Sequence, residues 1–180
     1  MITGPSGAGK TTIYRELLRR EPDLWFSVSA TDRPPRPGEV DGRDYHFMTR
    51  PQFEALRDAA GFLEWFEVYG DLKGTPREPV DERLAGGRDV LLEIDVQGAL
   101  AVRRQHPDAV LVFLEAPSRE EQQRRIEARG DSDPLDVQRR LAAAAAEEAL
   151  ADDFDHVVVN DDVDAAAARV AGILAARRGA

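Results

Sequence analysis

An α/β fold with a mainly parallel sheet flanked by helices is predicted by two features of this 180-residue sequence. Four short segments are nearly unbroken apolar runs, rich in β-branched and aromatic residues, which is typical of strands buried on both faces. Segments with helical features lie between these runs, and such alternation with short connections favours a parallel sheet. The predicted strands cover residues 25–28, 90–95, 110–114 and 157–160.

The helices between these strands have recognisable ends. A glycine at position 61 stops one of them, and the alanine run 142–146 has high helix propensity. Side chains that can accept a hydrogen bond from a first-turn N–H precede three of the helices. These capping residues are Thr49, Ser118 and either Asp161 or Asp162.

Two segments do not fit the alternation. Residues 31–45 hold three prolines and three arginines, and residues 129–137 are polar and turn-like. Insertions on an α/β scaffold commonly carry the parts that handle a ligand. We therefore expect these two segments to contribute to a functional site.

The charge balance excludes some classes of function. The chain has 24 Lys and Arg against 34 Asp and Glu, a net charge of −10, and a pI near 4.8. A protein that binds nucleic acid needs a basic surface, so no nucleic-acid partner is expected. No apolar stretch approaches the ~20 residues of a membrane span. With no cysteine and no secretory signal at the start, we expect a cytoplasmic protein of one domain.

A phosphate-binding loop stands at the beginning of the chain. The eight residues Gly4, Pro5, Ser6, Gly7, Ala8, Gly9, Lys10 and Thr11 match the pattern G-x-x-x-x-G-K-[ST] in full. Glycines let backbone N–H groups turn inward around a phosphate, and the lysine reaches the β- and γ-phosphates. The following helix directs its N-terminal dipole at the same anion. Only three residues precede Gly4, so the first strand is short.

Asp95 adds an acidic element to this loop. It stands at the carboxyl end of the predicted strand 90–95, where a carboxylate can help to hold Mg²⁺. Taken alone, the same residue is better explained as a simple cap of the next helix, which begins at Gln97. Beside a phosphate loop the metal role is favoured, with Thr11 and Asp95 as the predicted magnesium ligands.

Several further motifs, in order along the chain, resemble the guanylate kinases of bacteria. They are residues 27–39 (SVSATDRPPRPGE), 42–47 (GRDYHF), 62–65 (FLEW), 74–75 (GT), 94–99 (IDVQGA) and 129–130 (RG). The resemblance extends over essentially the whole chain. It implies the reaction ATP + GMP ⇌ ADP + GDP with Mg²⁺, GMP or dGMP as acceptor, and no nucleic-acid or membrane partner.

The resemblance also implies three parts within the domain. These are a core (1–28, 76–116 and 141–180), a GMP-binding subdomain (29–75) and a mobile lid (117–140). The implied ATP-binding residues are Gly4, Pro5, Ser6, Gly7, Ala8, Gly9, Lys10, Thr11 and Thr12. The implied GMP-binding residues are Ser29, Arg33, Arg36, Tyr45, Glu64, Lys73, Thr75, Glu93 and Asp95. The implied catalytic residues are Lys10, Arg36, Arg125, Arg129 and Arg140. Arg125 and Arg129 lie four residues apart and are expected to share a helix face, and Arg140 is expected to begin the next helix.

These roles agree with the chemistry of the ligands. A dianionic phosphate suits the forked donors of Arg33 and Arg36. Guanine presents two adjacent N–H donors, which suit the carboxylate of Glu64, and its O6 acceptor suits a hydroxyl at Ser29 or Thr75. Adenine lacks that donor pair, so a site of this kind discriminates between the bases.

Four features depart from the family pattern. Asp32 stands where a second Thr is usual, and it places a negative charge beside Arg33 in an anion site. Lys73 stands where many members have Tyr, and Glu93 where Asp is expected. The fourth is the short first strand. Three other functions remain open at this point: a binding module without catalysis, a kinase for another acceptor such as a ribose bisphosphate, and a nucleotide hydrolase.

Overall fold

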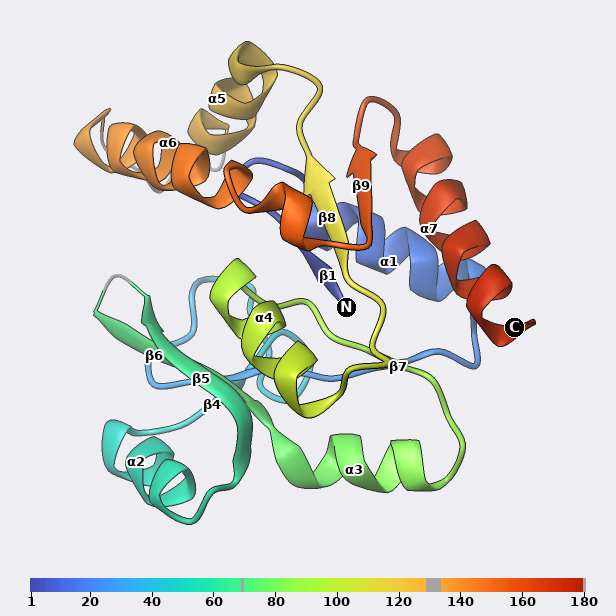
Figure 1. The fold of residues 1–180 in the computed structure, drawn as a ribbon. Helices are drawn as coiled ribbons and strands as arrows, with labels where there is room; N and C mark the ends of the chain where they lie inside the picture. Colours follow the sequence, from blue (N-terminus) through green and yellow to red (C-terminus); the bar gives the residue numbers. More distant parts are fainter. Residues whose placement is uncertain (69, 129–133, 180) are drawn as a thin grey trace. The chain divides into compact units, whose positions relative to one another are not determined.

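The computed structural model describes residues 1–68, 70–128 and 134–179. The chain forms two compact units (Figure 1). The first consists of Met1–Pro22, Glu93–Ala99 and Pro107–Ala180, and the second of Asp23–Leu92 and Leu100–His106.

The first unit is built on a parallel sheet with the strand order β1-β8-β9. Figure 1 shows α1 and α7 side by side, although they lie at opposite ends of the sequence. The helices α5 and α6 also pack against each other. The elements of this unit are β1 (Ile2–Thr3), α1 (Lys10–Arg20), β8 (Val112–Glu115), α5 (Arg119–Glu127), α6 (Pro134–Glu148), the 3₁₀ turn Ala151–Asp153, β9 (His156–Val159) and α7 (Val163–Arg178). The helix α4 (Val96–Gln105) begins in this unit and ends in the second.

The first strand is short but fully inserted. Ile2 pairs with Val112 on one side and forms a single parallel bridge to Glu93 on the other. Its side chain is 1% exposed. Since the chain-terminal ammonium of Met1 also donates to the Val110 carbonyl at 2.6 Å, the few residues before the phosphate loop are held firmly.

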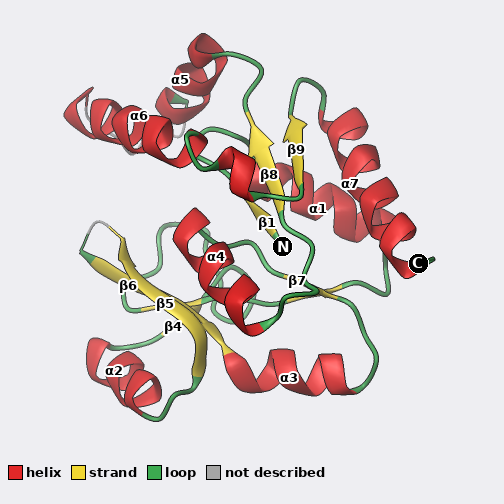
Figure 2. Ribbon diagram, in the orientation of Figure 1, coloured by secondary structure: helices red, strands yellow, loops and turns green. Residues whose placement is uncertain are grey.

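The second unit contains a mixed four-stranded sheet in the order β4-β3-β6-β5 and a separate parallel pair, β2 with β7 (Figure 2). A small core of Ala30, Phe53, Phe62 and Leu72 fills one face of the mixed sheet. The rings of Phe53 and Phe62 stack with centroids 4.3 Å apart. The elements are β2 (Trp25–Phe26), β3 (Ala30–Thr31), β4 (His46–Phe47), α2 (Arg50–Asp58), β5 (Phe62–Val68), β6 (Asp71–Pro76), α3 (Arg77–Ala85) and β7 (Val90–Leu91).

The predicted fold class is confirmed, and the capping residues are the expected ones. Thr49 accepts from the N–H of Gln52 in a complete capping box, Ser118 accepts from Glu121, and Asp162 rather than Asp161 caps α7. None of the helices in the described part of the chain is both long and apolar enough to cross a membrane.

Some expectations about the elements were wrong. The strand predicted for 25–28 is regular only at Trp25–Phe26. The strand predicted for 90–95 is regular only at Val90–Leu91. Residues 134–137 belong to α6 rather than to a turn, because Pro134 suits the first turn of a helix, and 129–133 lie outside the described residues. The antiparallel pair β5 and β6 was not predicted, since its strands are half exposed and not continuously apolar.

Candidate functional site

The backbone of the phosphate loop requires glycine at three positions. Gly4, Gly7 and Gly9 have φ angles of 143°, 85° and 89°, which L side chains rarely adopt. A β-carbon on Gly4 would lie 2.2 Å from the Leu114 carbonyl oxygen, and one on Gly9 would lie 2.2 Å from Asn160 Nδ2. The loop is therefore packed tightly from outside.

Four backbone carbonyl groups of this loop accept hydrogen bonds from side chains. Lys10 Nζ donates to Gly4 O at 2.6 Å and to Pro5 O at 3.3 Å. Gln122 Nε2 donates to Ser6 O at 3.1 Å, and Asn160 Nδ2 donates to Ala8 O at 2.8 Å. Each of these four carbonyls thus accepts a hydrogen bond from a side chain of the protein.

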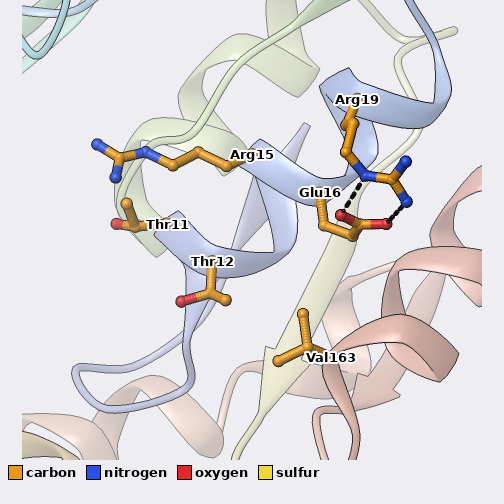
Figure 3. Close-up of a pocket in the computed structure, with 6 residues that line it drawn as sticks. All are labelled: Thr11, Thr12, Arg15, Glu16, Arg19 and Val163. Atoms are coloured by element: carbon orange, nitrogen blue, oxygen red, sulfur yellow. Dashed lines mark hydrogen bonds and ion pairs between the residues drawn. The ribbon is translucent and has the colours of Figure 1, made fainter.

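A shallow groove of about 400 Å³ lies beside the start of α1 (Figure 3). Thr11 and Thr12 stand in the first turn, at the positive end of the helix dipole. The N–H of Thr12 donates to the Gly9 carbonyl at 3.1 Å. Farther along the helix, Glu16 pairs with Arg19 at 2.7 Å. The end of the groove near the threonines thus favours an anion. The groove is lined by Thr11, Thr12, Arg15, Glu16, Arg19 and Val163.

Arg125 lies against the phosphate loop. Its Nη2 donates to the Asn160 carbonyl at 3.1 Å and its Nε to Glu121 at 2.9 Å. The remaining Nη1 atom is buried without a hydrogen-bond partner among the described residues, and it lies 3.6 Å from the β-carbon position of Gly9. A buried donor beside the loop is a favourable partner for a phosphate oxygen.

The other two predicted lid arginines differ from this one. Arg140 is half-buried in the middle of α6, so the prediction that it begins a helix was wrong. Arg129 lies outside the described residues. The sharing of one helix face by Arg125 and Arg129 therefore stays a prediction.

Carboxylates gather near Lys10 in this unit. Burial raises the pKa of Glu147, and the nearby carboxylates of Asp95 and Glu148 raise it further, while the Lys10 ammonium opposes them. Burial and the charge of Glu148 likewise raise the pKa of Glu115. The Lys10 ammonium and the Asp95 carboxylate thus both act electrostatically on Glu147. No group of three or more His, Cys, Asp or Glu side chains is placed to share a metal ion among the residues that the structure describes.

In the second unit, cationic and aromatic side chains form a cluster. The Arg33 guanidinium lies 5.0 Å from the Tyr45 ring centroid, and Lys73 Nζ lies 5.9 Å from the same ring. Glu39 holds Arg33 through two hydrogen bonds of 2.6 and 2.7 Å, which raise the pKa of Arg33. A third bond goes to Pro34 O at 2.9 Å, so two of the five guanidinium N–H donors have no partner among the residues that the structure describes.

Asp32 does not oppose this cluster in the way its sequence position suggests. Its carboxylate accepts from the Leu72 N–H at 2.6 Å and from Arg50 at 3.2 Å. The Asp32 carboxylate thus links the end of β3 to β6, and Arg50 partly neutralises its negative charge. Arg36 is exposed in the adjoining loop, where its N–H donates to Glu39 at 2.7 Å.

Glu64 and Thr75 form a pair across the two longest strands of this unit. They face each other in the register of β5 and β6, and the Thr75 hydroxyl donates to Glu64 Oε1 at 2.5 Å. Thr75 is 1% exposed, whereas Glu64 is half-buried. Ser29 directly precedes β3, and its carbonyl accepts from the His46 N–H at 2.9 Å. Glu93 and Asp95, also predicted to bind GMP, belong to the other unit.

The comparison with protein families decides what kind of chain this is. The family model described as guanylate kinase matches residues 1–177. The chain belongs to the guanylate kinase family. A guanylate kinase of Gloeobacter violaceus is 53% identical over 97% of this chain and 85% of its own length. A guanylate kinase of Thermus thermophilus is 52% identical over 99% of this chain and 80% of its own length.

A solved structure agrees with the sequence relatives. The crystal structure of guanylate kinase from Anaplasma phagocytophilum superposes with a TM-score of 0.81 at 32% identity. The match covers 97% of this chain and 82% of that chain. The predicted resemblance to guanylate kinases is thus confirmed.

The structure of this guanylate kinase family member brings together two sets of predicted residues, one in each unit. It also shows three residues that interact with the phosphate loop and that sequence reasoning missed, namely Gln122, Glu147 and Asn160. A Gln or Glu on a helix is usually solvated, and Asn160 stands at the end of a predicted strand, so none of the three has a local signal. Gln122 lies 116 residues along the chain from its partner Ser6, and Asn160 lies 152 residues from Ala8. Only these long-range contacts identify the two amides.

Proposed function

We propose that this chain transfers the γ-phosphoryl group of ATP to GMP, forming ADP and GDP, the activity for which its family is named. The observation that carries the proposal is the pair formed by Glu64 and Thr75 at 2.5 Å. A half-buried carboxylate fixed by a buried hydroxyl suits a base with two adjacent N–H donors. A sugar phosphate has no base that would use it.

The GMP phosphate is assigned to Arg33, Arg36, Tyr45 and Lys73. Arg33 supports this role because Glu39 orients it and two of its N–H donors remain. The Tyr45 ring contacts both Arg33 and Lys73, so its hydroxyl belongs to the same cationic neighbourhood. Lys73 adds a mobile point charge, where an arginine would add a fixed fork.

The guanine base is assigned to Glu64, Thr75 and Ser29. A carboxylate has about four acceptor sites, so Glu64 can accept from the N1–H and N2–H₂ donors of guanine in addition to the Thr75 hydroxyl. Since the single hydrogen of Thr75 is donated to Glu64, the hydroxyl of Ser29 is the better donor for O6.

The ATP phosphates are assigned to the phosphate loop, from Gly4 to Thr12. Lys10 donates to two neutral carbonyls, and a phosphate oxygen offers it a stronger, charged acceptor. Arg125 contributes a buried donor beside Gly9 that has no partner within the described residues. Together with Arg129 and Arg140 it would neutralise charge that spreads over the transferring phosphoryl group, and such neutralisation carries much of the rate.

Magnesium is the metal expected with ATP, and the oxygen ligands present fit it. Thr11 offers an exposed hydroxyl in the first turn of α1, and Asp95 is half-buried within electrostatic reach of Glu147. Mg²⁺ commonly takes one or two protein oxygens beside phosphates and water. When bound, it neutralises charge on the β- and γ-phosphates.

Glu93 remains a proposed neighbour of the base. The cytoplasm is the proposed compartment.

The acceptor is tested by measuring ADP formation with Mg-ATP and each of GMP, dGMP, AMP and ribose 1,5-bisphosphate, beside a control without acceptor. The proposal predicts turnover with GMP far above turnover with AMP. Turnover with the ribose bisphosphate, or the same rate without acceptor, would overturn it in favour of another acceptor or simple hydrolysis.

A further inference from the structure

Two buried side-chain amides donate hydrogen bonds to backbone carbonyl groups of the phosphate loop. Gln122 comes from α5 and Asn160 from the end of β9, and they are 1% and 2% exposed. Their donors meet the carbonyl oxygens of Ser6 and Ala8 at 3.1 and 2.8 Å. A buried amide usually indicates a specific polar partner, because an unsatisfied one costs free energy.

Because the peptide bond is planar, these contacts also determine the direction in which the neighbouring N–H groups point. In a trans peptide the C=O of one residue and the N–H of the next point in opposite directions. When Ser6 O is turned toward Gln122, the N–H of Gly7 is turned away from it. When Ala8 O is turned toward Asn160, the N–H of Gly9 is turned away in the same manner. Each amide thus fixes the direction of one N–H group in the loop.

We propose that Gln122 and Asn160 are positioning residues for the ATP phosphates: they hold two loop carbonyls outward so that the N–H groups of Gly7 and Gly9 face the anion. This inference rests on the proposed function, since it assigns ATP to the loop. It concerns groups that touch no substrate themselves.

The orientation of Gln122 is itself determined by its surroundings. Arg119 donates to Gln122 Oε1 at 3.2 Å, and a guanidinium can only donate. The oxygen must therefore face Arg119, which turns the NH₂ group toward Ser6 O and toward Glu148 Oε1 at 3.2 Å. Arg119 and Glu148 also pair directly at 3.0 Å. The four groups form one connected network whose arrangement allows a single amide orientation.

The close packing around the two amides leaves the loop little freedom to turn. A β-carbon on Gly7 would meet the backbone carbonyl oxygen of Gln122 at 2.7 Å, and one on Gly9 would meet Asn160 Nδ2 at 2.2 Å. Preorganised N–H groups stabilise an anion without reorganising when it binds. We therefore expect the two amides to act on affinity for the phosphates, beyond their contribution to stability.

The test uses variants that keep side-chain volume and net charge: Gln122→Met and Asn160→Leu. The matched control is Gln123→Met, the next residue on the same helix, which is exposed and donates to Glu127. Titration calorimetry with ADP and, separately, with GMP measures the two sites. Thermal unfolding checks that each variant is folded. If Asn160→Leu does not fold, Asn160→Ala removes the same donor without changing the net charge.

Each amide variant is expected to bind ADP roughly tenfold more weakly. Without its donor the loop carbonyl turns toward another partner in the free protein, and turning it outward again for ADP costs about one hydrogen bond. GMP affinity and the control variant stay within twofold of the wild type. In turnover, KM for ATP rises while KM for GMP does not. ADP affinity within twofold of the wild type in both folded variants would overturn the inference, as would an equal loss for ADP and GMP.

A result that contradicts the proposed function does not by itself contradict the role of the two amides. A wild-type chain that binds ADP but does not phosphorylate GMP contradicts the proposed function, while the ADP titrations still decide the role of the amides. Faster amide exchange at Gly7 and Gly9 in the free variants than in the control is the second expected readout. Unchanged exchange at both glycines counts against the positioning role.

Discussion

Replacing Glu64 by Gln isolates the base-reading carboxylate with little change in shape. Thr75 donates to Glu64 Oε1, and the amide oxygen of a glutamine can accept that same hydrogen bond. The strand pairing of β5 and β6 is therefore expected to survive, with little change in melting temperature. The substitution replaces the second carboxylate oxygen by an NH₂ group, and this group would place a donor opposite a donor of guanine.

The size of the effect follows from the bond that is lost. A hydrogen bond to a charged group contributes about 1.5–3 kcal/mol, and about 1.4 kcal/mol corresponds to a factor of ten. Losing one of two such bonds to guanine therefore predicts GMP binding weaker by roughly 10- to 150-fold. AMP does not present the donor pair, so its weak binding changes far less, and the GMP-to-AMP preference narrows.

The assay is ADP formation over a range of GMP and AMP concentrations for the wild type and for Glu64→Gln. Glu67→Gln is the matched control, because Glu67 lies on the same strand with a side chain that is 57% exposed. KM for ATP reports on the phosphate loop of the first unit and stays constant. If the variant keeps the GMP-to-AMP preference of the wild type, or if Glu67→Gln loses as much, the assignment of Glu64 is refuted.

Three further predictions concern the first unit and its surroundings. Lys10→Met lowers turnover about a hundredfold or more while GMP binding, measured by calorimetry, stays unchanged; comparable turnover would remove the lysine from the site. Gly9→Ala lowers the melting temperature more than Gly38→Ala, because both have positive φ but only the first would place a β-carbon within 4 Å of other atoms; equal losses would contradict the packing described. Hydrogen bonds from two arginines of α1 lower the pKa of Glu16 from 4.5 to about 2, so its stabilising effect is present above pH 4.5 and is lost as the pH falls toward 2. Thermal unfolding therefore depends less steeply on pH in Glu16→Gln over this acidic range, and an identical dependence would exclude the effect.

The sequence predicted best those elements whose signals are local. Capping residues such as Thr49 and Ser118 act within three residues of themselves, so their side-chain contacts could be foreseen. The phosphate loop is also local, because its glycines and Lys10 lie in one short segment. Its surroundings could not be foreseen, since Gln122 and Asn160 reach the loop from far along the chain.

The second unit was harder to predict for a different reason. Its main strands, β5 and β6, are partly exposed, and a search for continuous apolar runs detects only strands that are buried on both faces. The pairing of Glu64 with Thr75 depends on the register of these strands. Asp32 shows the same limit: its charge suggested interference with Arg33, whereas its contacts with Leu72 and Arg50 give it a structural role.

Transfer of a phosphoryl group to GMP is the central claim, and ³¹P NMR of the purified chain with Mg-ATP and GMP tests it most directly. The account predicts that ADP and GDP resonances grow together in equal amounts as ATP and GMP decline, with no rise in inorganic phosphate. Inorganic phosphate growing in step with ADP while GMP persists would contradict it, because the γ-phosphoryl group would then be passing to water.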